Sequence, residues 1–361
     1  MLRKADKYIL FSAVFLILIG FIMILSVAPI ALRDHGDGFY YVKRHLCYLL
    51  LGAVVCAAAL RLDSQKLRRL AAPGLLLSLI LLGLTYIPAL SISVGGAARW
   101  IRLGAVSFQP AELAKVFIIL YIAQALAQKK AMVRDFWRGV FPLLAVSGVL
   151  ILGILLQPDL GTSLVIAATV LAMLAAASSN LADIFLLALL GFRALVFWVM
   201  RHPYQLKRLM VFLNPWQDPL DAGYNTKQSL IAVGSGGLLG LGLGHSRQKF
   251  SWLPENHTDF IFAVICEEGG FLLAALVVAA FAVLVVRGLR LAARAAAPFD
   301  GFLALGYSLC LGIQALVNMM VVTAMLPTKG ITLPFVSYGG TSLLVSLFML
   351  GVILRISRDT G

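Results

Sequence analysis

The stretch Trp252-Leu-Pro-Glu-Asn-His-Thr-Asp-Phe-Ile-Phe-Ala-Val264 marks the change of character on which the fold prediction depends. It closes the longest polar part of the chain. From Phe260 onward an apolar run follows that is long enough to cross a bilayer. Glu255, His257 and Asp259 stand directly before that run, so the sequence places two carboxylates and an imidazole at a membrane edge.

Two interpretations of Asp259 are open. Thr258 or Asp259 could simply cap a helix, because Ser, Thr or Asp before an apolar run is the ordinary start of a helix. Alternatively the crowding of ionisable groups, with Arg247 and Lys249 just upstream, indicates a functional site, since such groups are costly at a membrane edge unless they are used.

The composition of the whole chain agrees with a membrane protein. Of 361 residues 61% are hydrophobic and only 13% are charged, with a mean hydropathy of +0.95. A soluble protein of this length needs more polar surface, so we expect an integral membrane protein with one domain covering residues 1–361. The formal net charge of +14 fits cytoplasmic loops and anionic lipid better than nucleic acid, which we exclude as a partner.

The hydropathy pattern predicts an all-α polytopic fold with about ten transmembrane helices. The expected spans are 8–32, 45–60, 73–92, 111–127, 139–156, 160–177, 181–200, 260–286, 301–326 and 335–354. Basic residues concentrate in alternate short loops, which places both termini in the cytoplasm by the positive-inside rule. Segment 201–259, between the seventh and eighth spans, then forms a large extracytoplasmic loop.

Other polar positions have more than one interpretation. Glu112 and Lys115 are three residues apart at the start of the fourth span, so they form an ion pair or line a polar cavity; we favour the cavity. Asp159 is expected to cap the sixth span. The glycine-rich stretch 230–244 is expected to be re-entrant or to lie on the surface, where its glycines serve as a hinge or approach a phosphate. The four cysteines show no metal-ligand spacing.

Six motifs, in order along the chain, resemble the SEDS family of bacterial membrane proteins (shape, elongation, division and sporulation). They are Ala98-Arg-Trp-Ile-Arg102, Phe108-Gln-Pro-Ala-Glu-Leu-Ala-Lys115, Gln157-Pro-Asp-Leu-Gly-Thr162, Phe212-Leu-Asn-Pro-Trp-Gln-Asp-Pro219, Leu253-Pro-Glu-Asn-His-Thr-Asp-Phe-Ile-Phe262 and Gly330-Ile-Thr-Leu-Pro-Phe-Val-Ser-Tyr-Gly-Gly340. The chain is most similar to the FtsW/SpoVE branch, with the RodA branch as the alternative. Ser251 stands where many members carry an acidic residue.

The resemblance implies a peptidoglycan glycosyltransferase that polymerises lipid II at the outer face of the bacterial cytoplasmic membrane. It implies that Asp259 is the essential acid of the loop and that Glu112 and Lys115 line the central cavity. The partners it implies are a class B penicillin-binding transpeptidase and the proteins of the divisome or elongasome.

A mechanism that fits these residues uses Asp259 to deprotonate the 4-hydroxyl of the acceptor sugar. Cations would stabilise the departing lipid pyrophosphate, and one base with direct displacement inverts the anomeric carbon. The candidates for binding the substrate, its pyrophosphate or the cavity lining are Glu112, Lys115, Arg102, Lys329, Arg247, Lys249, Glu255 and His257. No residue pattern indicates a metal site, although a divalent cation, Mg²⁺ or Mn²⁺, could assist.

Two other functions are open from the sequence. A lipid II flippase would need a polar path through the bilayer, whereas the polar residues here gather at the outer face. A scaffold that only docks a transpeptidase would tolerate Asn in place of Asp259.

Overall fold

A computed structural model describes residues 5–27, 32, 36–94, 97–103, 106–128, 135–177, 181–202, 206, 208–210, 212, 223–250 and 253–360. Within these ranges nine helical segments are long and apolar enough to cross a membrane. They are α1 (Lys7–Ser26), α3 (Tyr40–Ala59), α4 (Ser64–Leu84), α5 (Pro110–Gln128), the run Phe136–Leu155 that contains α6 (Phe141–Leu155), α7 (Leu160–Ala177), α11 (Ile261–Arg294), α12 (Pro298–Val322) and α13 (Gly340–Thr360).

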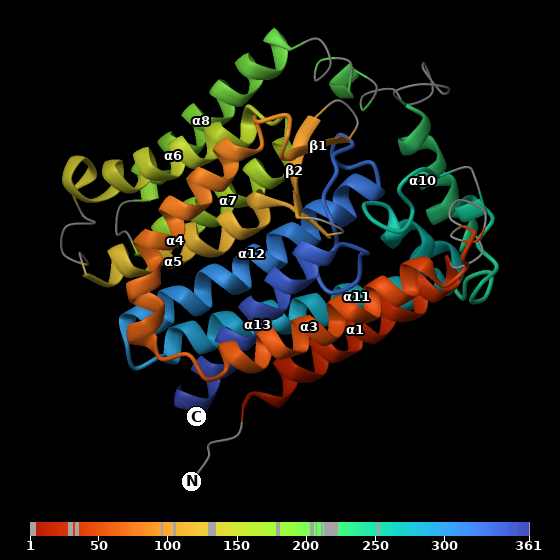
Figure 1. Cartoon of the computed structure of the whole chain (residues 1–361), viewed down its shortest axis with the longest axis horizontal. Helices are drawn as coiled ribbons and strands as arrows, with labels where there is room; N and C mark the ends of the chain where they lie inside the picture. The colour runs from red at the N-terminus through yellow and green to blue at the C-terminus, as the bar shows by residue number, and fades with distance from the viewer. Residues whose placement is uncertain are drawn as a thin grey trace.

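The remaining expected span, 181–200, coincides with α8 (Leu181–Arg201). The all-α polytopic prediction is therefore confirmed. Figure 1 shows the helices as one bundle with both chain ends at the same end of it. Helix α12 lies at the centre, against α5, α7, α11 and α13, while α3 packs along α13 and α1 along α11.

Several predicted boundaries were wrong. Helix α4 begins at Ser64 rather than near residue 73, because its first turns are amphipathic and Pro73 is accommodated inside the helix. Helix α13 begins at Gly340 rather than 335, since residues 335–339 form the turn before it. Helix α11 extends to Arg294, eight residues beyond the expected end at 286.

A three-stranded antiparallel sheet occupies the loop before α5, which the all-helical prediction missed. Its strands are β1 (Ser91–Val94), β2 (Ala97–Leu103) and β3 (Val106–Phe108), in the order β1-β2-β3. Ile92 lies opposite Trp100, and Arg102 lies opposite Ser107. Gly95 and Gly96, the expected turn, lie outside the described residues.

The glycine-rich stretch packs against a kink in α11. Helix α10 (Tyr224–Ser235) precedes it. Gly270, inside α11, has a φ of 66°, and a Cβ there would lie 2.3 Å from the Gly240 nitrogen. Backbone hydrogen bonds join the two segments, including Leu241 N to Glu267 O at 2.9 Å and Phe271 N to Gly237 O at 2.9 Å. Gly240 and Gly270 therefore permit close packing between the backbone of this stretch and the backbone of α11.

Two clusters of polar side chains lie at the end of the bundle where both termini are found. Arg355 on α13 pairs with Asp300 on α12 at 2.6 Å, and the Ser64 hydroxyl donates to the same carboxylate. Arg287 pairs with Asp6 at 2.5 Å. These contacts fasten α1, α4, α11, α12 and α13 at the end of the bundle away from the cavity described below.

Replacing Gly270 with alanine tests the kink. The new Cβ would meet backbone atoms, and alanine is strained at this positive φ, so the unfolding free energy should fall by about 1–3 kcal/mol. Gly148→Ala in α6 is the matched control, because a Cβ there meets nothing within 4 Å and alanine favours helix. Thermal unfolding of the purified protein in detergent measures both; equal stability of the two variants would contradict the packing described.

Candidate functional site

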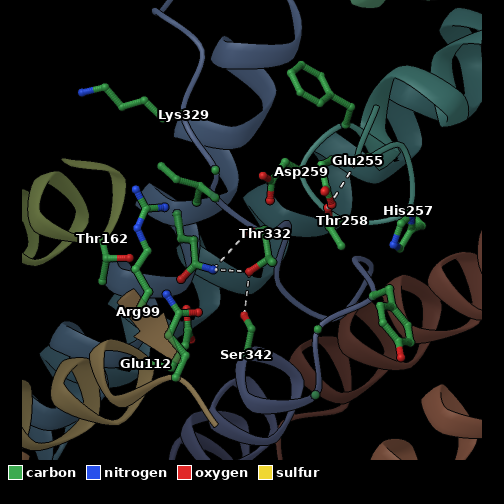
Figure 2. A pocket seen from close by; sticks show the side chains of 18 of the residues that line it. Arg99, Glu112, Thr162, Glu255, His257, Thr258, Asp259, Lys329, Thr332 and Ser342 are labelled. Atoms are coloured by element: carbon green, nitrogen blue, oxygen red, sulfur yellow. Dashed lines mark hydrogen bonds between the residues drawn. The ribbon is translucent and has the colours of Figure 1, made fainter. Parts of the chain in front are cut away.

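A polar cavity of about 450 Å³ lies at the end of the bundle opposite the termini. Its walls come from the starts of α3, α5, α7 and α13, from the β-sheet, from Gln314 on α12 and from the loops 255–260 and 328–339. Figure 2 shows the side chains of Asp259, Glu255, Arg99, Glu112 and Lys329 around this space. The cavity therefore collects polar groups from distant parts of the sequence at one membrane edge.

Asp259 lies in the turn before α11 and does not cap it. The helix begins at Ile261, and its N-cap residue, Phe260, makes no side-chain capping bond. The Asp259 side chain is half-buried, and within the described part of the chain no hydrogen bond reaches its carboxylate. Desolvation, together with the nearby charges of Glu255 and Asp159, raises the pKa of Asp259 to about 7. Such a carboxylate is suited to accept a proton near neutral pH.

The main chain around Asp259 is held by α12 and by the segment that precedes α13. Asn318 Nδ2 donates to the Asp259 carbonyl at 2.8 Å and to the Ile331 carbonyl at 2.6 Å. The Ser337 hydroxyl donates to the Thr258 carbonyl at 2.6 Å, and the Tyr338 nitrogen donates to the His257 carbonyl at 2.9 Å. Side chain and backbone donors thus fix the loop on both sides of the carboxylate.

Gly330 sits directly against this carboxylate. A Cβ added at Gly330 would lie 2.9 Å from Asp259 Oδ2. The absence of a side chain at residue 330 therefore leaves room for the carboxylate in its observed position.

Glu255 and His257 occupy the same loop. Thr258 Oγ1 donates to Glu255 Oε2 at 2.9 Å, and Glu255 itself has a φ of 54°, a strained conformation for a residue other than glycine. The His257 ring stacks on Tyr41, with ring centroids 4.5 Å apart. Both residues line the cavity, as the sequence predicted.

The floor of the cavity is a chain of hydrogen bonds through three helices. Lys115 Nζ contacts Glu112 Oε1 at 2.9 Å and Gln314 Oε1 at 2.5 Å, and both charged side chains are almost completely buried. Gln314 Nε2 donates to Thr332, whose hydroxyl bonds Ser342 at 2.7 Å (Figure 2). Glu112 and Lys115 thus form an ion pair and also line the cavity. Glu112 Oε2 is buried and accepts no hydrogen bond from the residues that the structure describes.

Among the described residues that line the cavity, cations outnumber acids. The cations are Arg44, Arg99, Lys115, Arg208 and Lys329, and the acids are Glu112, Glu255 and Asp259. Desolvation, and next the nearby Arg208, lower the pKa of Lys329 to about 8. The cavity therefore presents a positive surface that favours an anionic ligand.

Three of the candidate cations lie outside this cavity. Arg102 is exposed on β2 and Arg247 is exposed in the turn after the glycines. Lys249 is buried, and its Nζ binds Glu268 Oε1 and Ser26 Oγ, each at 2.7 Å. Lys249 thus fastens the loop to α11 and α1, because a buried ammonium requires a partner.

Several lining residues were missed by the sequence analysis as site residues. Arg99, Arg44 and Gln314 line the cavity, and none of them is among the predicted site residues. A polar amide inside a span was the available indication. Asp159 does cap α7, accepting from Thr162 N at 3.0 Å. All of the motif Phe212–Pro219 except Phe212 lies outside the described residues.

The oxygen and nitrogen side chains of the cavity limit how a divalent cation could bind there. The described residues contain no group of three or more His, Cys, Asp or Glu side chains arranged as metal ligands. Asp259 and Glu255 share the cavity, so a hard cation here would take one or two carboxylates and complete its shell with phosphate and water.

Comparisons with known proteins agree with one another. The family model FTSW_RODA_SPOVE, described as "Cell cycle protein", matches residues 6–361. The probable peptidoglycan glycosyltransferase FtsW of Geobacter sulfurreducens (strain DL-1 / KN400) is 44% identical over 357 residues, which are 99% of this chain and 96% of that protein. Stage V sporulation protein E of Bacillus subtilis (strain 168) is 39% identical over 354 residues, 98% of this chain and 97% of that protein.

Solved structures have the same fold. A chain from a peptidoglycan synthase complex, studied for its coordination of polymerization and crosslinking, has a TM-score of 0.80 and 30% identity, with 99% of this chain and 98% of that chain covered. The rod shape determining protein RodA of Thermus thermophilus has a TM-score of 0.73 and 29% identity, with 99% and 97% covered. The chain therefore belongs to the FtsW/RodA/SpoVE family of multi-pass membrane proteins, the SEDS family.

Proposed function

We propose that this chain is a peptidoglycan glycosyltransferase that polymerises lipid II, with Asp259 as the general base. The observation that carries the proposal is the Asp259 carboxylate, half-buried and without a hydrogen bond among the described residues, in a cavity with an excess of cations. Relatives that match nearly the whole chain are named for the same activity, and the match to B. subtilis stage V sporulation protein E supports a role in division or sporulation.

The reaction couples two lipid-linked sugars. Asp259 takes the proton of the acceptor 4-hydroxyl, the acceptor oxygen bonds to C1 of the donor, and the bond from C1 to the pyrophosphate oxygen breaks with inversion. Negative charge then grows on the lipid pyrophosphate. Lys329, Arg99 and Arg208 line the cavity and would stabilise that charge.

The location of the cavity favours a transferase over a flippase. Its lining residues lie at one end of their helices or in the adjoining loops. A flippase would need polar groups along the whole path through the bilayer. We infer that the cavity faces outward across the bacterial cytoplasmic membrane and that both termini are cytoplasmic, in agreement with the basic residues of the short loops.

A crosslinking partner follows from the reaction. Glycan strands become a wall only when their peptides are joined, and the synthase complex that contains a similar chain combines polymerization with crosslinking. We infer that this chain works with a class B penicillin-binding transpeptidase, within a divisome or an elongasome.

Replacing Asp259 with asparagine should abolish polymerisation. The amide cannot accept the proton, so the rate should fall by about 10²–10⁴-fold. Purified protein with its cognate transpeptidase is incubated with lipid II, and glycan strands are separated by gel. Equal thermal stability and equal co-purification of the transpeptidase serve as controls. Undiminished product from Asp259→Asn would remove this residue from the chemistry and leave the scaffold hypothesis.

The pH profile should follow Asp259 and Lys329. The base acts as a carboxylate, so kcat/KM should fall as pH drops below about 7. The ammonium binds pyrophosphate only when charged, so kcat/KM should also fall as pH rises above about 8. Initial polymerisation rates at low lipid II concentration give this profile. Lys329→Arg should move the alkaline limb upward, and an alkaline limb unchanged in that variant would contradict the assignment.

Replacing Gly330 with alanine should reduce activity with little loss of stability. The new Cβ would displace the Asp259 carboxylate, which is the mobile end of a side chain, so we expect the rate to fall by about tenfold or more. Gly339→Ala is the matched control in the same cavity, because its Cβ would meet its nearest atoms at 3.4 and 3.6 Å. Equal rates for the two variants would show that the position of the Asp259 carboxylate beside Gly330 does not affect the polymerisation rate.

A further inference from the structure

The cavity is chemically different on its two sides. On one side of Asp259 lie Lys329 and Arg99, and on the other side lies His257 (Figure 2). Arg208 belongs to the first side, where it donates to the Thr328 carbonyl at 3.1 Å, next to Lys329. The second side has aromatic rings in its wall, from Tyr338, Tyr48 and His257. A reaction between two similar substrates can use this asymmetry to tell them apart.

The aromatic side is a packed cluster drawn from three segments. Tyr41 on α3 stacks against His257 at 4.5 Å and contacts the Tyr338 ring edge-on at 5.1 Å. The backbone hydrogen bond from Tyr338 N to His257 O ties the two loops together. His257 and Tyr338 line the cavity, and Tyr41 supports them from behind. The rings are therefore held in place before any substrate arrives.

Such a surface matches a sugar ring. One face of a pyranose carries mainly C–H bonds, and aromatic rings pack on apolar faces while polar groups at the edge bind hydroxyls. Arg44, three residues after Tyr41 and so on the same face of α3, also lines the cavity. Its Nη1 donates to the Tyr40 hydroxyl at 2.5 Å, which fixes a positive charge beside the aromatic cluster.

We propose that the Tyr338–His257 surface, supported by Tyr41, binds the sugar ring of the acceptor, and that the Lys329–Arg99–Arg208 side holds the pyrophosphate of the donor. This inference rests on the proposed glycosyl transfer. The leaving group of the donor needs cations, whereas the acceptor needs only to be oriented with its hydroxyl at the base. His257 and Asp259 belong to one loop and line the same cavity, so a sugar packed on the His257 ring shares the cavity with the carboxylate.

The test separates the donor and acceptor roles of lipid II. Lipid II whose terminal sugar lacks the 4-hydroxyl can act as donor but cannot act as acceptor. Only products that carry this blocked unit at their end are counted. Native lipid II is varied at several fixed blocked-donor concentrations, and the blocked donor is varied at several fixed native lipid II concentrations. Fitting both series to a model in which either molecule can occupy either site gives the acceptor KM and the donor KM.

His257→Leu should raise the acceptor KM by about tenfold, since stacking is lost, and leave the donor KM within about twofold. His257→Phe keeps a ring without a titratable nitrogen and should stay near the native acceptor KM. Tyr338→Leu and Tyr338→Phe repeat the comparison from the other loop. Lys329→Gln should give the opposite pattern, with a raised donor KM.

The proposal is overturned if His257→Leu raises the acceptor KM and the donor KM equally or raises neither. It is also overturned if the Phe and Leu variants have the same acceptor KM. A failure of the proposed function looks different: Asp259→Asn would then form blocked products at the native rate, whatever the constants of the aromatic variants. Melting temperatures measured in detergent show whether each variant is folded, and the ratio of the two KM values does not depend on the folded fraction.

Discussion

Two side-chain amides on one face of α12, Gln314 and Asn318, organise the cavity. Gln314 joins Lys115 on α5 to Thr332, and Asn318 joins the Asp259 carbonyl to the Ile331 carbonyl. Inside a bilayer no water is available to form hydrogen bonds with buried polar groups, so these amides must find partners within the protein. The same bonds that satisfy them fix the distance between the floor of the cavity and the loop that carries Asp259.

Two lysines that are buried in the described part of the chain, Lys115 and Lys249, show how differently one type of side chain is used. Lys115 contacts Glu112 and Gln314 at the wall of the cavity, where its charge can still act on a ligand. Lys249 is buried with Glu268 and Ser26, and its ammonium group holds the loop to α11 and α1. Because a buried ion pair is weak evidence for stability, specificity of loop placement is the better explanation for the second pair.

Hydropathy predicted the spans and their order, because about 20 apolar residues have few alternatives to a membrane helix. The charge pattern, together with the resemblance to the SEDS family, predicts nine site residues, of which Asp259, Glu255, His257, Glu112, Lys115 and Lys329 line the cavity. It could not separate Lys249 from Lys329, since both are basic residues beside a span and only their three-dimensional partners differ. The sheet was missed although Ser91-Ile-Ser-Val94 alternates polar and apolar residues, a pattern of strands that is weak over so short a length.

The loop that carries Asp259 is secured by residues that follow it in the chain. Asn318, Ser337 and Tyr338 hold its backbone, and Ser342, in the last helix, completes the floor. During biosynthesis these residues are made after the loop. The loop therefore cannot take up its observed backbone position until α12 and the segment before α13 have been synthesised.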